Sequence, residues 1–301
     1  MASDRLRSLP AYLAVRLFVG LFGLLPEPVM RRVGRGLGLA LSYLAPSKRR
    51  MAERHQRRVQ GDGVDATRAA RRVMASYGRY WAEVFWIRPR RKQAILDRSV
   101  LEHPERLHAA IADERGIVLA VGHFGNWEVA GLRAAAEGAP VLAAAENLGN
   151  PRITEWFVGL RETMEIDVVL TGRGRRAMGE LAKRVREGGT VALLSDRDLS
   201  GRGVPVTFFG EETTLPAGPV ALAERTGAIL LPVGIYFRDD VPGHRFVIHP
   251  PLEIPEAPTT EERVALGTQA LAGVLEEIIR HRPEQWHVIV PNWPSDRGAD
   301  T

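Results

Sequence analysis

The segment "GIVLAVGHFGNWE" (116–128) decides the fold. Its apolar run, 117–121, is short and bounded by glycines, which is typical of a strand buried inside a sheet. His123 follows directly, at the strand end where α/β proteins gather their functional side chains. A histidine with a carboxylate in reach can take a proton from a hydroxyl near neutral pH. The alternative is a histidine that merely caps the next helix.

The same alternation of apolar runs and helical stretches continues along the chain. Further strands are predicted at 140–145, 167–170, 190–195, 228–237 and 245–250, and helices at 127–137, 151–164, 174–187, 217–226 and 259–282. Strands that alternate with helices favour βαβ units. We therefore predict an α/β fold with a mixed, largely parallel central sheet flanked by helices.

The N-terminal region differs from the rest. Residues 10–46 predict two apolar helices broken at "PEP" (26–28), followed by a basic helix and then a helix over 65–92 with an aromatic face. The uncharged blocks are too short to cross a bilayer, and basic residues flank them. We expect 1–60 to be a helical segment lying in the membrane interface and 61–301 to form the α/β domain. A buried helical hairpin is the alternative.

Composition excludes several classes of protein. The 301 residues include no cysteine, so disulfides and thiolate metal sites are impossible. A net charge of +5 favours an anionic partner, such as a phosphorylated molecule or an anionic membrane surface. The basic residues lack an RNP-type or helix-turn-helix pattern, so no nucleic-acid partner is expected. No Gly-x-Ser-x-Gly hydrolase motif occurs.

The motif itself predicts a base without an enzymic nucleophile. If Gly122 and Gly125 bend the chain, Glu128 can hold one imidazole nitrogen of His123 while the other faces substrate. Main-chain N–H groups of Gly125 and Asn126 at the helix start would stabilise an oxyanion. The substrate's own hydroxyl would then be the nucleophile. This describes direct acyl transfer from a thioester to an alcohol.

A histidine followed four residues later by an acid resembles the glycerolipid-type acyltransferases. "GHFGNWE" is similar to the lipid A lauroyl/myristoyl acyltransferase branch, and the resemblance extends to "AAENLGNPRI", "LPAGPVALAERTGAILLPV" and "RPEQWHVIVPNWP". Within that branch, the arginine-rich chain and "SDRDLSGRGVPVTFFG" most resemble the actinobacterial phosphatidylinositol mannoside acyltransferases. The motif acid is Glu128, where the wider superfamily has aspartate.

The short apolar blocks and basic residues of 9–50 predict a peripheral protein on the cytoplasmic face of the plasma membrane, and the resemblance implies an acyltransferase there. It would move a long acyl chain, such as palmitoyl, from acyl-CoA to a mannose hydroxyl of a membrane glycolipid, with His123, Glu128 and Asp196 as catalytic residues. Acyl-CoA would be a co-substrate, and no cofactor or metal is expected. A lipid A-type or other lysophospholipid acyltransferase is the alternative. A non-enzymatic basic protein would explain the charge but not the polar clusters after buried strands.

Asp196, Arg197 and Asp198 follow the apolar run 190–194, so they are also expected at a strand end. The resemblance matches Asp196 to an acid that assists the histidine, while Arg197 and Asp198 would bind acceptor hydroxyls. Two alternatives remain open for this cluster. It is either a structural ion-pair network or the Asp-x-Asp metal site of a metal-dependent glycosyltransferase.

The remaining candidates surround the same strand ends. Glu146 follows the run 140–145, and Arg161 is expected to point from its helix into the cleft. The basic stretch 171–189 offers Arg173, Arg175 and Arg176 to the phosphates of coenzyme A or of the acceptor, unless it is simply a solvated face. Trp286 in "PEQW" is expected to be structural.

Overall fold

The computed structural model describes residues 9–145, 149–171, 175–198, 201–238 and 241–297. Its centre is a seven-stranded sheet with the order β1-β9-β8-β2-β5-β3-β4. The strands are β1 (Ser99–Glu102), β2 (Ile117–Val121), β3 (Val141–Ala145), β4 (Ile166–Leu170), β5 (Thr190–Leu194), β8 (Ile229–Phe237) and β9 (His244–Ile248). Five neighbouring strands from β8 to β4 run parallel, and β9 runs antiparallel to β8. The predicted mixed, largely parallel sheet is confirmed.

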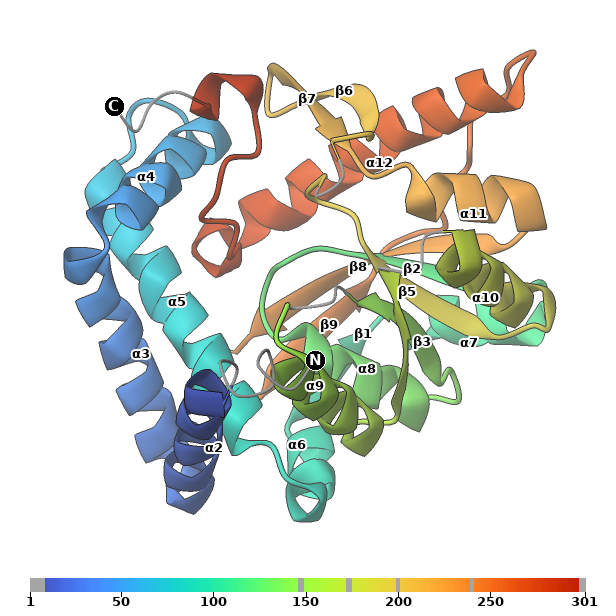
Figure 1. The fold of residues 1–301 in the computed structure, drawn as a ribbon. Helices are drawn as coiled ribbons and strands as arrows, with labels where there is room; N and C mark the ends of the chain where they lie inside the picture. Colours follow the sequence, from blue (N-terminus) through green and yellow to red (C-terminus); the bar gives the residue numbers. More distant parts are fainter. Residues whose placement is uncertain (1–8, 146–148, 172–174, 199–200, 239–240, 298–301) are drawn as a thin grey trace.

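Helices cover both faces of this sheet (Figure 1). The flanking helices are α7 (Pro104–Ala112), α8 (Trp127–Ala136), α9 (Pro151–Thr163), α10 (Arg175–Arg186), α11 (Gly218–Thr226) and α12 (Thr260–His281). A capping box begins the last helix, because Thr259 and Glu262 exchange hydrogen bonds there. All five predicted helices of this region form.

The N-terminal helices group together on one side of the molecule (Figure 1). They are α2 (Leu9–Leu24), α3 (Glu27–Leu44), α4 (Pro46–Gln60) and α5 (Ala66–Trp86). Glycines allow α3 to approach α5 closely, because a Cβ at Gly38 would lie 2.0 Å from the Met74 carbonyl oxygen. No helix within the described ranges is long and apolar enough to cross a membrane.

Several elements were not predicted. They are β1, the antiparallel hairpin β6 (Val204–Phe208) and β7 (Glu211–Leu215), the short helices α6 (Lys92–Asp97) and α7, and the 3₁₀ turns η1 (Pro89–Arg91), η3 (Pro283–Gln285) and η4 (Pro294–Asp296). The hairpin stands apart from the main sheet, so its strands alternate buried with exposed residues and lack a continuous apolar run.

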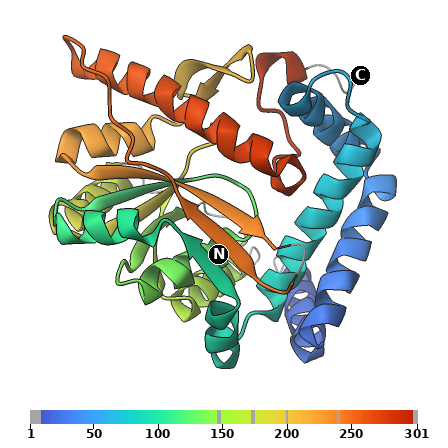
Figure 2. The ribbon, with the colours of Figure 1, turned by 180° about the vertical axis from the view of Figure 1, so that it is seen from behind.

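After α12 the chain turns back toward the N-terminal helices. Figure 2 shows this last segment beside α4. We call residues 285–296 the C-terminal strap. Its first residues run antiparallel to the motif segment, with a β-bridge between Phe124 and Trp286. The strap therefore joins α4 to the carboxyl ends of the central strands.

Candidate active site

His123 and Asp196 meet where the parallel neighbours β2 and β5 end. The imidazole Nδ1 lies 2.8 Å from Asp196 Oδ1, and the main-chain N–H of His123 donates to Oδ2 at 2.8 Å. The carboxylate of Asp196 is fully buried, whereas the His123 side chain is one-fifth exposed and lines a cleft. Because the carboxylate engages Nδ1, Nε2 is the imidazole nitrogen left to the cleft.

Hydrogen bonds keep the Asp196 carboxylate charged despite its burial. Burial alone would raise the pKa of Asp196, but the opposing charge and hydrogen bonds of His123, with a further bond from Trp286, hold that pKa below its ordinary value. The carboxylate can therefore orient the imidazole and stabilise its protonated form.

Glu128 does not occupy the position predicted for it. Its two carboxylate oxygens accept from Arg161, at 2.9 Å from Nε and 2.8 Å from Nη2. The acid that holds the imidazole is Asp196 instead, because Glu128 lies in the first turn of α8 and faces α9. Burial opposes charge on the Arg161 guanidinium, yet Glu128 raises the pKa of Arg161 above its ordinary value. The pair is a buried bidentate ion pair.

The turn between His123 and α8 depends on Gly125 and Asn126. Gly125 has φ of +59°, and a Cβ there would lie 2.4 Å from the Ile235 carbonyl oxygen. Its N–H donates to the Gln285 carbonyl at 3.2 Å and so is not available to an oxyanion, contrary to expectation. Asn126 caps α8 through its side-chain oxygen, and its amide donates to Glu83 Oε2 at 2.9 Å. Both residues shape the turn.

The cleft beside His123 has a volume of about 660 Å³. Aromatic side chains from three helices form one wall: Tyr77, Tyr80 and Trp81 of α5, Trp127 of α8 and Phe157 of α9. In the sequence, the aromatic residues of α5 have the spacing of an ordinary helix face that packs in a core. Their position in the cleft was therefore not predicted. Three arginines, Arg161, Arg197 and Arg202, and one acid, Asp198, also line the cleft, and Arg161 is paired with Glu128. Of these, Arg202 was not predicted.

A second, narrow cavity of about 80 Å³ lies between α8 and the sheet. Small residues create it, because Ala130, Gly131 and Ala134 of α8 face Ala143 and Ala192 of the strands. The rest of its lining is mainly apolar, with the charged side chains of Glu128, Arg133 and Arg161 also at its wall. Trp127 and Arg161 border both this cavity and the cleft, so the two spaces adjoin.

The Asp-x-Asp pair already has protein donors. Asp198 Oδ1 accepts from the Gly201 N–H at 3.1 Å, and Oδ2 accepts from Gly203 at 2.7 Å and Thr214 at 3.0 Å. Asp198 lines the cleft while shaping its own loop. Asp198 therefore holds its own loop, whereas Asp196 holds His123. This separation removes the reason for placing one metal ion between the two carboxylates.

The remaining predicted site residues lie either outside the described part of the chain or on the surface of α10. Glu146 and Arg173, and the side chain of Arg175, are outside the described part of the chain. Arg176 is exposed and pairs with Glu180 on α10 at 3.2 Å. Arg184 pairs with Asp167 of β4 and Lys183 with Glu187 just after α10, which also matches a solvated face.

The strap contributes a second histidine next to the motif. The main-chain N–H of His287 donates to the His123 carbonyl at 2.7 Å, and its Nε2 lies 2.9 Å from Ser76 Oγ. Burial lowers the pKa of His287 to about 3, so this ring stays neutral at physiological pH. No local sequence pattern indicates this placement, since Ser76 and His287 are far apart in the chain.

We expect His287 to make the folded protein sensitive to mild acid. Its folded pKa lies below the unfolded value of about 6.5, so its contribution is complete above pH 6.5 and is lost as pH falls toward 3. Urea denaturation between pH 7.5 and 5 should show wild-type stability falling more steeply than that of His287→Gln, by up to about 1.4 kcal/mol per pH unit. The exposed control His103→Gln should follow wild type. Equal slopes for all three proteins would contradict the assignment.

The chain resembles known proteins along most of its length. The family model described as bacterial lipid A biosynthesis acyltransferase matches residues 2–295. A phosphatidylinositol mannoside acyltransferase of Mycobacterium tuberculosis (strain ATCC 25618 / H37Rv) is 38% identical over 229 residues, 74% of this chain and 69% of the relative. One of Mycolicibacterium smegmatis is 36% identical over 227 residues, 75% of this chain and 72% of the relative. The chain therefore belongs to the bacterial lipid A biosynthesis acyltransferase family and is an acyltransferase.

Proposed function

We propose that the protein transfers a long acyl chain, such as palmitoyl, from acyl-CoA to a mannose hydroxyl of a phosphatidylinositol mannoside. The observation that carries the mechanism is the His123–Asp196 pair at the mouth of an aromatic cleft. The similarity to phosphatidylinositol mannoside acyltransferases supports this acceptor over lipid A or a lysophospholipid.

In this mechanism His123 Nε2 removes the proton of the acceptor hydroxyl. The hydroxyl oxygen attacks the thioester carbonyl, and Asp196 stabilises the imidazolium that results. The carbon–sulfur bond then breaks, and the coenzyme A thiolate leaves with the proton that the imidazolium returns. No acyl-enzyme forms, because the attacking group belongs to the substrate, and none of these steps uses a metal or cofactor.

The two hollows differ in the groups that they could hold. Aromatic faces and arginines in the cleft match a sugar bearing an anionic inositol phosphate. The apolar cavity under α8, of about 80 Å³, has room for only one end of a hydrocarbon chain, so the rest of a long acyl chain would lie outside it. Trp127 and Arg161 stand between them, beside the base.

The test is to incubate purified protein with a mixed acyl-CoA pool and several acceptors, then to identify lipid products by mass spectrometry. Acceptors would include phosphatidylinositol mannosides, a lysophospholipid and a lipid A precursor. We expect acylation of the mannosides, unchanged by EDTA. Acylation of another acceptor alone, or loss in EDTA that Mg²⁺ or Mn²⁺ restores, would contradict the proposal.

Filling the apolar cavity should shift acyl-chain preference. Ala134 is buried at its lining, about 10 Å along α8 from Trp127. Ala134→Leu would occupy part of the cavity, so the preferred acyl-CoA should become shorter, with overpacking costing about 1–3 kcal/mol of stability. Ala136→Leu, exposed on the same helix, is the matched control. An unchanged chain preference in both variants would place the acyl chain elsewhere.

The surface of α2 and α3 supports attachment to the cytoplasmic face of the plasma membrane. Exposed apolar residues repeat at helical spacing on both helices: Leu13, Leu17, Leu21 and Leu24 on α2, and Val29, Val33, Leu37, Leu41 and Leu44 on α3. The opposite face of α3 packs on α5, so these stripes are not a buried hairpin. Exposed basic residues such as Arg32, Arg35 and Lys48 would meet anionic headgroups.

Acidic residues among the exposed leucines of α2 should weaken membrane binding. Because α3 packs on α5, point variants are a cleaner test than truncation. The double variant Leu17→Glu/Leu21→Glu should lower flotation with anionic liposomes at least about tenfold, since burial of each leucine is worth roughly 1.5–3 kcal/mol. Leu266→Glu, exposed on α12, is the control. Flotation equal to wild type would exclude this surface.

A further inference from the structure

Trp286 contacts the catalytic acid rather than serving only as core. Its indole is 1% exposed, and Nε1 donates to Asp196 Oδ2 at 2.7 Å. The same oxygen accepts the main-chain N–H of His123, whereas Oδ1 accepts from the imidazole. The two oxygens of Asp196 therefore have different partners. This correction replaces the purely structural role predicted for Trp286.

Backbone contacts fix the indole relative to the motif. Gly125 donates to the Gln285 carbonyl and His287 donates to the His123 carbonyl, on either side of Trp286. The Gln285 side chain also exchanges hydrogen bonds with the main chain of Phe237, at 2.7 and 3.2 Å. The start of the strap is thus held to β8 and to the motif turn at once.

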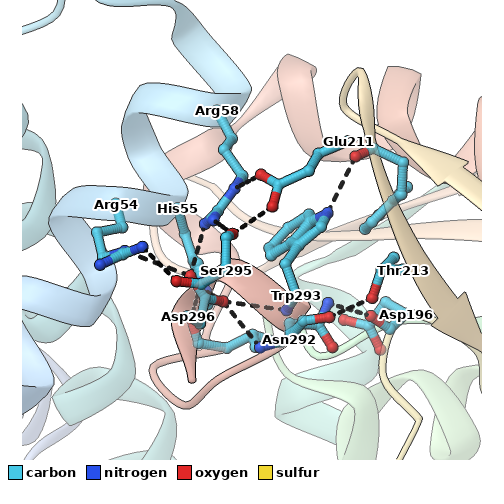
Figure 3. A network of polar contacts seen from close by, with 12 residues as sticks. Arg54, His55, Arg58, Asp196, Glu211, Thr213, Asn292, Trp293, Ser295 and Asp296 are labelled. Carbon is cyan, nitrogen blue, oxygen red and sulfur yellow. Dashed lines mark hydrogen bonds and ion pairs between the residues drawn. The ribbon is translucent and has the colours of Figure 1, made fainter. Parts of the chain in front are cut away.

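The end of the strap is fixed to α4 and reaches Asp196 again. Asn292 Nδ2 donates to the Asp196 carbonyl at 3.1 Å. Asp296 accepts the Asn292 N–H at 3.0 Å and lies 3.1 Å from His55 Nε2. Figure 3 shows Asp296 between Asn292 and the α4 side chains Arg54, His55 and Arg58.

We propose that Trp286 is a positioning residue that determines how strongly Asp196 polarises His123. Its N–H donates to Oδ2 and offsets part of the negative charge there. Oδ1 remains as the sole acceptor of the imidazole proton. This inference rests on the proposed role of His123 as the base. Without the indole N–H, negative charge concentrates on the carboxylate, and the pair binds its proton more tightly.

Other charged and titratable groups lie near the pair. His287 from the strap is neutral, Glu128 from α8 is paired with Arg161 from α9, and Arg197 lines the cleft beyond β5. Glu83 from α5 is paired with Arg79 and His244. His55 from α4 is paired with Asp296 and packs against the rings of both Trp286 and Trp293, so an effect that acts through His55 would appear in variants of either tryptophan.

The test compares Trp286→Phe with Trp293→Phe. Trp293 is equally buried in the strap, but its indole donates to the Phe208 carbonyl. For Trp286→Phe, the acidic limb of the pH profile of kcat/KM should move to higher pH by roughly half a unit or more. The same limb should stay in place for Trp293→Phe. If the acidic limb lies at the same pH in both variants, the inference is wrong.

A measurement without substrate separates this inference from the proposed function. The Nδ1–H proton resonance of His123 should move downfield in Trp286→Phe, because its hydrogen bond to Asp196 strengthens, and should not move in Trp293→Phe. If transfer survives His123→Ala, the proposed mechanism fails whatever this resonance does. If His123→Ala is inactive and the resonance does not respond to Trp286→Phe, only the inference fails.

A second readout covers the case in which Trp286→Phe does not fold. In Asp196→Asn, the indole N–H resonance of Trp286 should move upfield from its wild-type position, because a neutral amide oxygen is a weaker acceptor than a carboxylate. The Trp293 indole resonance should hold its position. An unmoved Trp286 resonance would overturn the assignment.

Discussion

Replacement of His123 by alanine is expected to lower the rate of acyl transfer by about 10²–10⁴-fold, the typical effect of losing a general base. The side chain is partly exposed in the cleft, so its removal leaves no buried group without a partner except one Asp196 oxygen. Folding should therefore persist. Steady-state transfer and thermal melting measured on the same preparation check both statements.

The matched control for this prediction is His103→Ala. His103 is half exposed in the turn before α7 and pairs with Glu105 on the surface, so transfer should remain at the wild-type rate. Near-wild-type transfer by a well-folded His123→Ala protein would show that the imidazole is not the base.

Glu128→Gln is expected to act differently, through stability. The carboxylate is 1% exposed and accepts from Nε and Nη2 of Arg161, so neutralising it leaves a guanidinium that is only 18% exposed without its counter-charge. Breaking a buried pair from one side typically costs about 3–5 kcal/mol. Urea denaturation of Glu128→Gln, Arg161→Met and the double variant should show the double to be more stable than the sum of the singles predicts.

The surface pair Arg184–Asp167 provides the reference for that cycle. Asp167 is largely exposed, so solvent and salt screen the interaction, and its coupling should not exceed about 1 kcal/mol. A Glu128–Arg161 coupling of the same small size would mean that the pair is not desolvated as the structure indicates. If Glu128→Gln instead loses acyl transfer without losing stability, then Glu128 takes a direct part in the chemistry.

The sheet was predictable because its central strands are buried on both faces. β2, β5 and β8 read as unbroken apolar runs, and the helices between them leave few ways to arrange the chain. β1 has only four residues, and β6 and β7 form a hairpin with one exposed face, so none of these left a comparable signal.

The sequence predicted that the site residues lie at strand ends, but it did not predict which of them contact each other. Parallel neighbours bring His123 and Asp196 together, and that pairing follows from the order of β2 and β5. The choice between Glu128 and Asp196 depends on the positive φ at Gly125, which directs α8 so that Glu128 meets Arg161. The contact from Trp286 depends on a segment 90 residues away from Asp196, for which no local pattern exists.

The strap has a consequence for how heat inactivates the enzyme. Trp286, Val288 and Trp293 of the strap are buried in the same apolar core as the central strands, and hydrogen bonds and ion pairs also hold the strap to α4 and to the motif. Segments that open separately at low free energy are those with few buried apolar contacts, and the strap is not such a segment. Release of the strap would remove the contacts of Trp286 and Asn292 with Asp196, but it would also expose two buried indoles. Activity on warming should therefore be lost together with the main cooperative transition rather than before it.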